Sequence, residues 1–131
     1  MLAGKSFSDK HFGPLPLFGS EKKPMSKQAI VVLSTAPDES VAASLAGALV
    51  EGKLAACVNL VSGVRSLYWW DGELQDDAEV LLICKTDSER LDALTRTLTE
   101  RHPYDCPEVV ALPVAGGAAA YLGWIGETLD R

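Results

Sequence analysis

The sequence predicts a one-domain α+β fold in which two helices cover one face of an antiparallel sheet. Two observations carry this prediction. Apolar, β-branched runs alternate along the chain with segments whose apolar residues recur every three or four positions. A strong two-residue turn, Asp71-Gly72, divides the longest strand-like stretch. The length of 131 residues suits a single domain that buries an ordinary core.

Composition excludes several classes of function. The net charge of −6 argues against a protein that binds nucleic acid or an acidic membrane, because such a protein needs a basic face. No apolar run approaches the roughly 18 residues that a membrane span requires. Three cysteines are an odd number for a disulfide scaffold, so we expect a reducing compartment and predict a cytoplasmic location.

The first 26 residues differ from the rest of the chain. All three Phe lie here among scattered Pro and Gly, and five Lys against two acids give residues 1–27 a charge of +3, whereas residues 28–131 carry −9. We therefore predict a flexible tail over 1–26 and the folded domain over 27–131. Alternative interpretations are a Phe-bearing docking motif, or a chain that properly begins at Met25.

The first strand and helix are predicted within residues 29–52. The unbroken apolar run 29–33 indicates a strand buried on both faces. Residues 35–38 have the hydroxyl, proline and acid of a helix start. Gly52 ends the helix, whose apolar face recurs at i, i+4 and i+8 through Val41, Leu45 and Leu49.

A hairpin over residues 56–86 is the most informative feature. Each arm spans roughly 45 Å, which a domain with a radius of gyration of about 13 Å cannot cover. The far half is therefore expected to overhang, with a bulge at Ser62-Gly63. An alternative is that the hairpin bends back over its own helices at Gly63. We favour a closed oligomer, because exposed aromatic surface usually marks an interface; its contacts are predicted to be Leu67, Tyr68, Trp69 and Trp70.

The second half predicts a helix, a strand and a last helix. Asp87 or Ser88 caps a helix that Pro103 stops. Residues 107–114 form a strand with prolines at both ends, which suggests an edge. The order β-α-β-β-α-β with an extra C-terminal helix defines a ferredoxin-like fold. The helix faces consist of Leu91, Leu94 and Leu98, and of Tyr121, Ile125 and Leu129.

Candidate chemistry lies between Arg101 and Glu108. His102, Asp105 and Cys106 offer an imidazole, a carboxylate and a thiol in a loop stiffened by prolines, and such donors suit copper or zinc. We name His102 and Cys106 as candidate metal ligands. The spacing matches no closed zinc pattern. The alternative is structural: His102 interacts with the carboxyl end of its helix and Cys106 is a small buried hydrophobe.

Other reactive groups have simpler interpretations. Cys57 and Cys84 lie in apolar contexts on the two hairpin arms and are interpreted as buried, inert thiols; a bulge at Gly63 would put them on opposite faces. Gly116-Gly117 before the last helix is interpreted as a turn. The acids near the hairpin turn are predicted to form a solvated face; they are Asp71, Glu73, Asp76, Asp77 and Glu79.

Several segments together resemble the CutA divalent-cation tolerance family over residues 28–130. The resemblance rests on Thr35–Asp38, Leu54–Asn59, Ser66–Gly72, Lys85-Thr86, His102–Tyr104 with Pro107-Glu108, and Tyr121–Trp124. It implies a stable homotrimer with hairpins packed between subunits, a link to copper and other divalent ions, no established enzymatic activity, and an architecture similar to PII signalling proteins.

The family's metal ligands do not carry over intact. In members to which copper binding is attributed, a Cys follows the first strand and two adjacent His precede Pro-Tyr. Here Ser34 and Arg101 stand at two of those positions, so we expect divalent cations such as copper to bind weakly or not at all. Rival functions are PII-like signalling, a scaffold whose tail recruits a partner, and an acylphosphatase-like enzyme. The enzyme would need an Arg-bearing phosphate loop that does not accompany Asn59.

Overall fold

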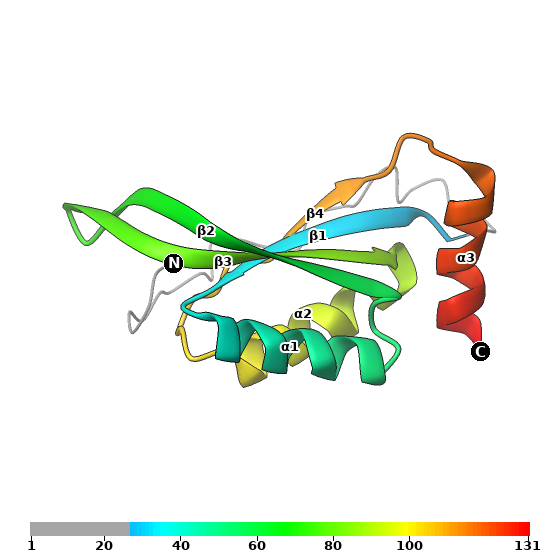
Figure 1. The fold of residues 1–131 in the computed structure, drawn as a ribbon, viewed down its shortest axis with the longest axis horizontal. Coiled ribbons are helices and arrows are strands. Elements are labelled where there is room, and N and C mark those ends of the chain that lie inside the picture. The colour runs from blue at the N-terminus through cyan, green and yellow to red at the C-terminus, as the bar shows by residue number, and fades with distance from the viewer. Residues whose placement is uncertain (1–26) are drawn as a thin grey trace.

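The computed structural model describes residues 27–131. The predicted order of elements and the ferredoxin-like α+β class are confirmed (Figure 1). The elements are β1 (Ala29–Ala36), α1 (Glu39–Glu51), β2 (Cys57–Trp70), β3 (Glu73–Asp87), the short 3-10 helix η2 (Ser88–Arg90), α2 (Leu91–Arg101), β4 (Val110–Pro113) and α3 (Ala119–Asp130).

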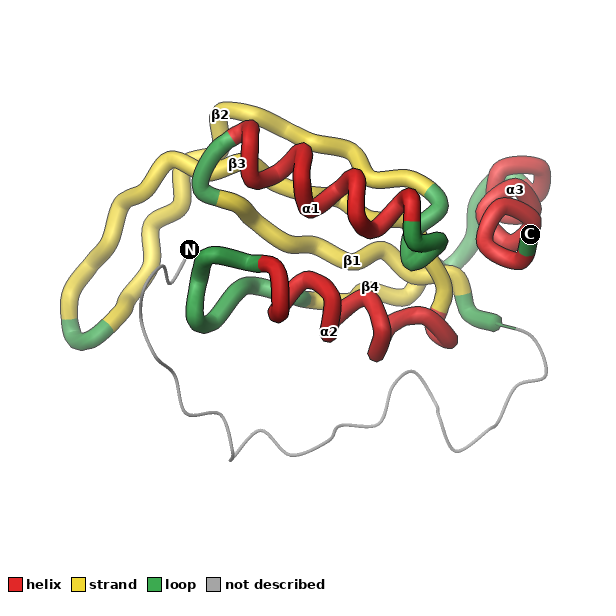
Figure 2. Tube along the Cα trace, turned by 90° about the horizontal axis from the view of Figure 1, so that it is seen from below, coloured by secondary structure: helices red, strands yellow, loops and turns green. Residues whose placement is uncertain are grey.

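The four strands form one antiparallel sheet in the order β2-β3-β1-β4. Helices α1 and α2 lie side by side over one face, while α3 stands at one end of the sheet (Figures 1 and 2). Strand β4 is an edge strand, as its flanking prolines predicted, but it covers only Val110–Pro113 rather than residues 107–114. The shorter strand is consistent with Pro107, which has no backbone N–H to donate to a ladder.

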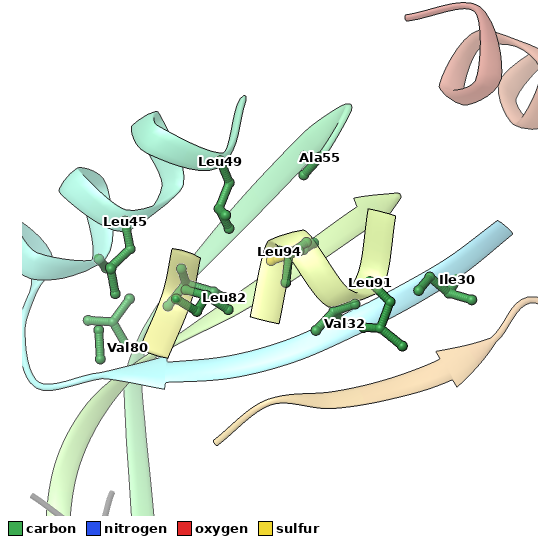
Figure 3. Close-up of a cluster of buried hydrophobic side chains, with 13 residues drawn as sticks. Ile30, Val32, Leu45, Leu49, Ala55, Val80, Leu82, Leu91 and Leu94 are labelled. Carbon is green, nitrogen blue, oxygen red and sulfur yellow. The ribbon is translucent and has the colours of Figure 1, made fainter. Parts of the chain in front are cut away.

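The core lies between the sheet and the two helices. Ile30 and Val32 of β1 alternate toward the helices, where they meet leucines of α1 and α2 (Figure 3). On the other face, Val31 and Leu33 are only half-buried. The prediction that this strand is buried on both faces therefore holds on the helix side alone, because no second helix layer covers the opposite side in one chain.

Local signals in the sequence explain where the elements begin and end. The Asp38 carboxylate accepts from the Val41 N–H at 2.9 Å and so caps the start of α1, and Gly52 is the C-cap at its other end. Asp87, one of the two predicted caps, accepts from the Arg90 N–H at the start of η2. Helix α2 ends at Arg101, and His102 is extended, as the residue before a proline should be.

The hairpin has the predicted turn and bulge. Asp71 and Gly72 both have positive φ, 56° and 76°, as a type I′ turn requires. The register shifts by one residue between Val61 and Val64, around Gly63. Cys57 consequently pairs with Lys85 and not with Cys84, which places the two thiols on opposite faces of the ribbon.

The distal half of the hairpin extends beyond the helices and does not fold back over them (Figures 1 and 2). On one face of this overhang Trp69 is 72% exposed, Leu67 57% and Leu74 59%. On the other face Tyr68 and Trp70 are half-buried. The expected overhang of aromatic surface is therefore present, and it is concentrated on the face that carries Trp69.

Candidate metal site and the polar cluster beside it

His102 lies at the junction of α2 and the following loop, against the end of β1. Its side chain is buried, and its Nε2 lies 2.7 Å from the Thr35 carbonyl oxygen. The Tyr104 backbone N–H donates to Nδ1 at 3.1 Å. The Tyr104 ring packs on the imidazole, with 4.5 Å between centroids. The loop after α2 is thus fastened to the sheet through one side chain.

These partners determine the protonation of His102. A carbonyl oxygen only accepts and a backbone N–H only donates, so Nε2 carries the hydrogen and Nδ1 is the acceptor. Burial lowers the pKa of His102 from its ordinary value, and the bond to Thr35 opposes this shift in part. The ring is therefore neutral and engaged at both nitrogens.

The predicted metal ligands do not form a ready donor set. Coordination by either nitrogen of His102 would break one of its hydrogen bonds. Within residues 27–131, no group of three or more His, Cys, Asp and Glu side chains is arranged to hold an ion. Ser34 is fully buried in β1, and Arg101 is an exposed cation. The assignment of His102 and half-buried Cys106 as ligands stays a prediction.

A buried carboxylate beside this loop escaped the sequence prediction. Glu79 was assigned to the solvated acidic face, but it is 2% exposed and accepts a hydrogen bond from the Tyr104 hydroxyl at 2.8 Å. That prediction is therefore wrong for Glu79, and Asp77 is half-buried and accepts from the Tyr68 hydroxyl. The missed signal was distance from the turn: Glu79 directly precedes the apolar run that enters the core.

Burial dominates the electrostatics of this polar cluster. It raises the pKa of Tyr104 to about 12, with smaller contributions from Tyr68, Asp77 and Asp38. The phenol is therefore a hydrogen-bond donor at all ordinary pH values. The cluster ties three parts of the chain together at the base of the hairpin: the end of β1 through Thr35, the loop after α2 through Tyr104, and β3 through Glu79.

The hairpin thiols are not poised for chemistry. Cys84 is fully buried in the core, and burial raises its pKa to about 12. A thiol that stays protonated is a poor nucleophile and a poor metal ligand. Cys57 is half-buried, with its Sγ 3.8 Å from the Asn59 Oδ1. The predicted burial is therefore found for Cys84, whereas Cys57 is only half-buried.

The four-stranded antiparallel sheet, its two covering helices and the overhanging hairpin place the chain among small α+β proteins with a ferredoxin-like fold. The model of the CutA1 divalent ion tolerance protein family matches residues 30–128. The chain therefore belongs to the CutA1 divalent ion tolerance family. No helix in the described part of the chain is long and apolar enough to cross a bilayer.

Individual relatives agree with this assignment. The divalent-cation tolerance protein CutA of Pectobacterium atrosepticum is 48% identical over 101 residues, which are 77% of this chain and 92% of that protein. The chloroplastic CutA 1 of rice is 52% identical over 97 residues, 74% of this chain but only 55% of the rice protein. The solved structure of the Thermus thermophilus protein superposes with a TM-score of 0.75 at 48% identity, covering 76% of this chain and 97% of that one.

Proposed function

We propose that this protein is a homotrimeric binding or sensing component of divalent-cation tolerance in the cytoplasm, and not an enzyme. The observation that carries the assembly is the overhang of the hairpin. Trp69, Leu67 and Leu74 form a continuous exposed apolar face on a two-stranded ribbon, which is marginal in water by itself. The matching surface on a neighbour is the uncovered face of its sheet, where Val110 and Leu112 are exposed.

Two features support binding without catalysis. The side chains with catalytic potential in the candidate site are already engaged: His102 by two backbone groups and Tyr104 by Glu79. The buried thiol of Cys84 is held protonated. A divalent cation such as copper would bind weakly or not at all, because Ser34 and Arg101 replace a thiolate and an imidazole with a hydroxyl and a cation.

Sedimentation equilibrium on the full chain tests the assembly. We expect three times the 14.0 kDa chain mass at micromolar concentration, and a shift toward monomer for Trp69→Ser combined with Leu74→Ser. The matched control is Tyr121→Ser with Trp124→Ser, which removes exposed apolar surface from α3 instead. A wild-type protein that sediments as a monomer would refute the trimer.

Copper titration by calorimetry tests the metal prediction. We expect wild type to bind copper more weakly than micromolar, and Ser34→Cys with Arg101→His, which restores both of the family's donors, to bind more tightly. His102→Ala should abolish that gain. Micromolar binding by wild type that His102→Ala removes would contradict weak affinity and assign His102 a metal role.

A further inference from the structure

Helix α3 packs separately from the main core. Leu122, Ile125 and Leu129 contact Ala56 in a small apolar cluster, whereas the main core is built from the sheet, α1 and α2. Figure 1 shows α3 at the end of the sheet opposite the hairpin tip. Loss of α3 would therefore uncover a small apolar surface while leaving the contacts between the sheet and the other two helices in place.

The sequence of α3 is poorly suited to an independent helix. It has 12 residues, including Gly123 and Gly126, and each Gly costs a helix interior about 1 kcal/mol relative to Ala. Ala118 at its start makes no side-chain cap bond, and its last turn carries no basic residue. Isolated helices of this length are marginal in water. Docking must therefore supply much of the stability of the helical conformation.

The missing C-terminal cap comes from other parts of the chain. The Lys53 ammonium donates to the Thr128 carbonyl oxygen at 3.1 Å, and the Arg90 guanidinium donates to the Leu129 carbonyl oxygen at 2.7 Å. Both cations thus satisfy carbonyls that the last turn leaves unpaired and sit at the negative end of the helix dipole. We call Lys53 and Arg90 together the cation clasp.

Arg90 is held in place before it meets α3. Its guanidinium donates to the Asp87 carboxylate at 2.8 Å and to the Lys53 carbonyl oxygen at 3.2 Å, and its side chain is mostly buried. A pre-positioned guanidinium loses little conformational freedom when the helix docks. The half-exposed Asp130 at the end of α3 also forms ion pairs with Arg90, at 3.3 Å, and with Lys27.

We propose that α3 docks and folds as one unit and detaches from an otherwise intact domain, and that the cation clasp sets how often it does so. The helix is then a removable cover for the Ala56 end of the sheet. Opening exposes Leu122, Ile125 and Leu129 and is a local event that costs less than global unfolding. Because Lys53 is exposed and salt screens the attraction between cations and the helix dipole, salt favours the open state. This inference does not depend on the proposed function.

Hydrogen–deuterium exchange on the full chain, resolved by peptide, tests the proposal. In wild type we expect the amides of residues 119–130 to exchange faster than those of β1 and β3, and faster still at high salt. Arg90→Gln should speed exchange in α3 by about tenfold or more, since it removes charge-assisted hydrogen bonds, with β1 and β3 unchanged. Lys53→Gln should act in the same direction by a smaller factor.

Arg96→Gln is the matched control, because it removes the same charge from an exposed arginine of α2 outside the clasp. If α3 exchanges no faster than β1 and β3 in wild type, the helix does not detach independently and the proposal fails. It also fails if Arg90→Gln changes α3 no more than Arg96→Gln does. Equal acceleration in α3 and in the sheet would assign Arg90 to global stability and likewise overturn the clasp.

Discussion

The two halves of β3 form the same ladder with β2 but meet different surroundings. From Val80 to Thr86, alternate side chains point into the core and are almost completely buried. From Glu73 to Ala78 the pairing continues, yet no helix lies over the ribbon, and Leu74 and Trp69 stay exposed. Backbone pairing therefore continues along the whole hairpin, whereas burial within one chain stabilises only the half that contains Val80 to Thr86. The exposed distal half is the part of the hairpin that the proposed trimer would cover.

The boundary between the two halves lies at Glu79. Its buried carboxylate accepts from the Tyr104 hydroxyl, the Tyr104 backbone N–H donates to His102, and His102 in turn bonds to the Thr35 carbonyl oxygen. A polar junction thus links the helix-covered sheet to the overhang. Substitutions in the core, at the junction and on the overhang should therefore change the stability of the chain by amounts that decrease in that order.

The largest effect is expected in the core. Leu82 is fully buried between the sheet and both helices. Leu82→Ala should lower the free energy of unfolding by about 2–5 kcal/mol, because it leaves a cavity in a packed core. If the proposed trimer forms, the loss of stability caused by Trp69→Ala, on the overhang, should instead depend on protein concentration, because Trp69 then contacts a second subunit. Equal, concentration-independent losses for the two variants would contradict the division of β3 into two halves.

The junction should give an intermediate effect. Tyr104→Phe removes the hydroxyl that donates to Glu79 and leaves a buried carboxylate with one donor fewer. We expect a loss of about 1–3 kcal/mol in the free energy of unfolding. Tyr68→Phe is the matched control, because its bond to Asp77 is half-exposed and water can replace it. A Tyr104→Phe variant as stable as the control would mean that the junction contributes nothing to stability.

The fold was predictable because its signals are local. Asp38, Gly52, Asp71-Gly72 and Pro103 each act within a few residues through capping, turn geometry or a missing N–H. The length of the hairpin relative to its domain predicted the overhang. None of these inferences required knowing which distant residues meet.

The candidate site was only partly predictable because its contacts are not local. His102 was identified from its place in the loop, but its bond to Thr35 joins residues 67 positions apart. Glu79 was misassigned because its burial depends on Tyr104, which lies 25 positions away. In the cation clasp, Lys53 likewise bonds to the distant Thr128, and no sequence motif around either residue predicts this contact.

The junction should also respond to pH. The pKa of His102 is lowered in the folded protein, so the unfolded chain binds a proton first as pH falls through about 6.5. The contribution of His102 to stability is complete above that pH and is lost as pH decreases toward the folded pKa. Chemical unfolding at pH values between about 5 and 7 should show stability rising with pH in wild type.

His102→Gln separates this effect from the carboxylates, which titrate in both proteins. Its amide can donate to Thr35 but takes up no proton, so the variant should show a shallower rise in stability over the same range. Identical slopes in the two proteins would mean that His102 is not the group whose protonation is suppressed on folding.

The smallest effect is expected on the overhang itself. Arg65 and Asp76 form a bidentate pair at 2.7 and 2.9 Å across β2 and β3, on the same face as Trp69. The hydrogen bond from Arg65 holds the pKa of Asp76 below its ordinary value, but both side chains are largely exposed, and such pairs contribute little to stability. Arg65→Ala should therefore barely change the free energy of unfolding of a dissociated chain.

If neighbouring subunits cover this face, the pair is removed from water and its loss leaves Asp76 without its cation in the interface. Arg65→Ala will then weaken assembly in sedimentation without changing the stability of the monomer. An effect on the monomer as large as that of Tyr104→Phe would show that the overhang is stabilised within its own chain, and would remove the reason for a second surface.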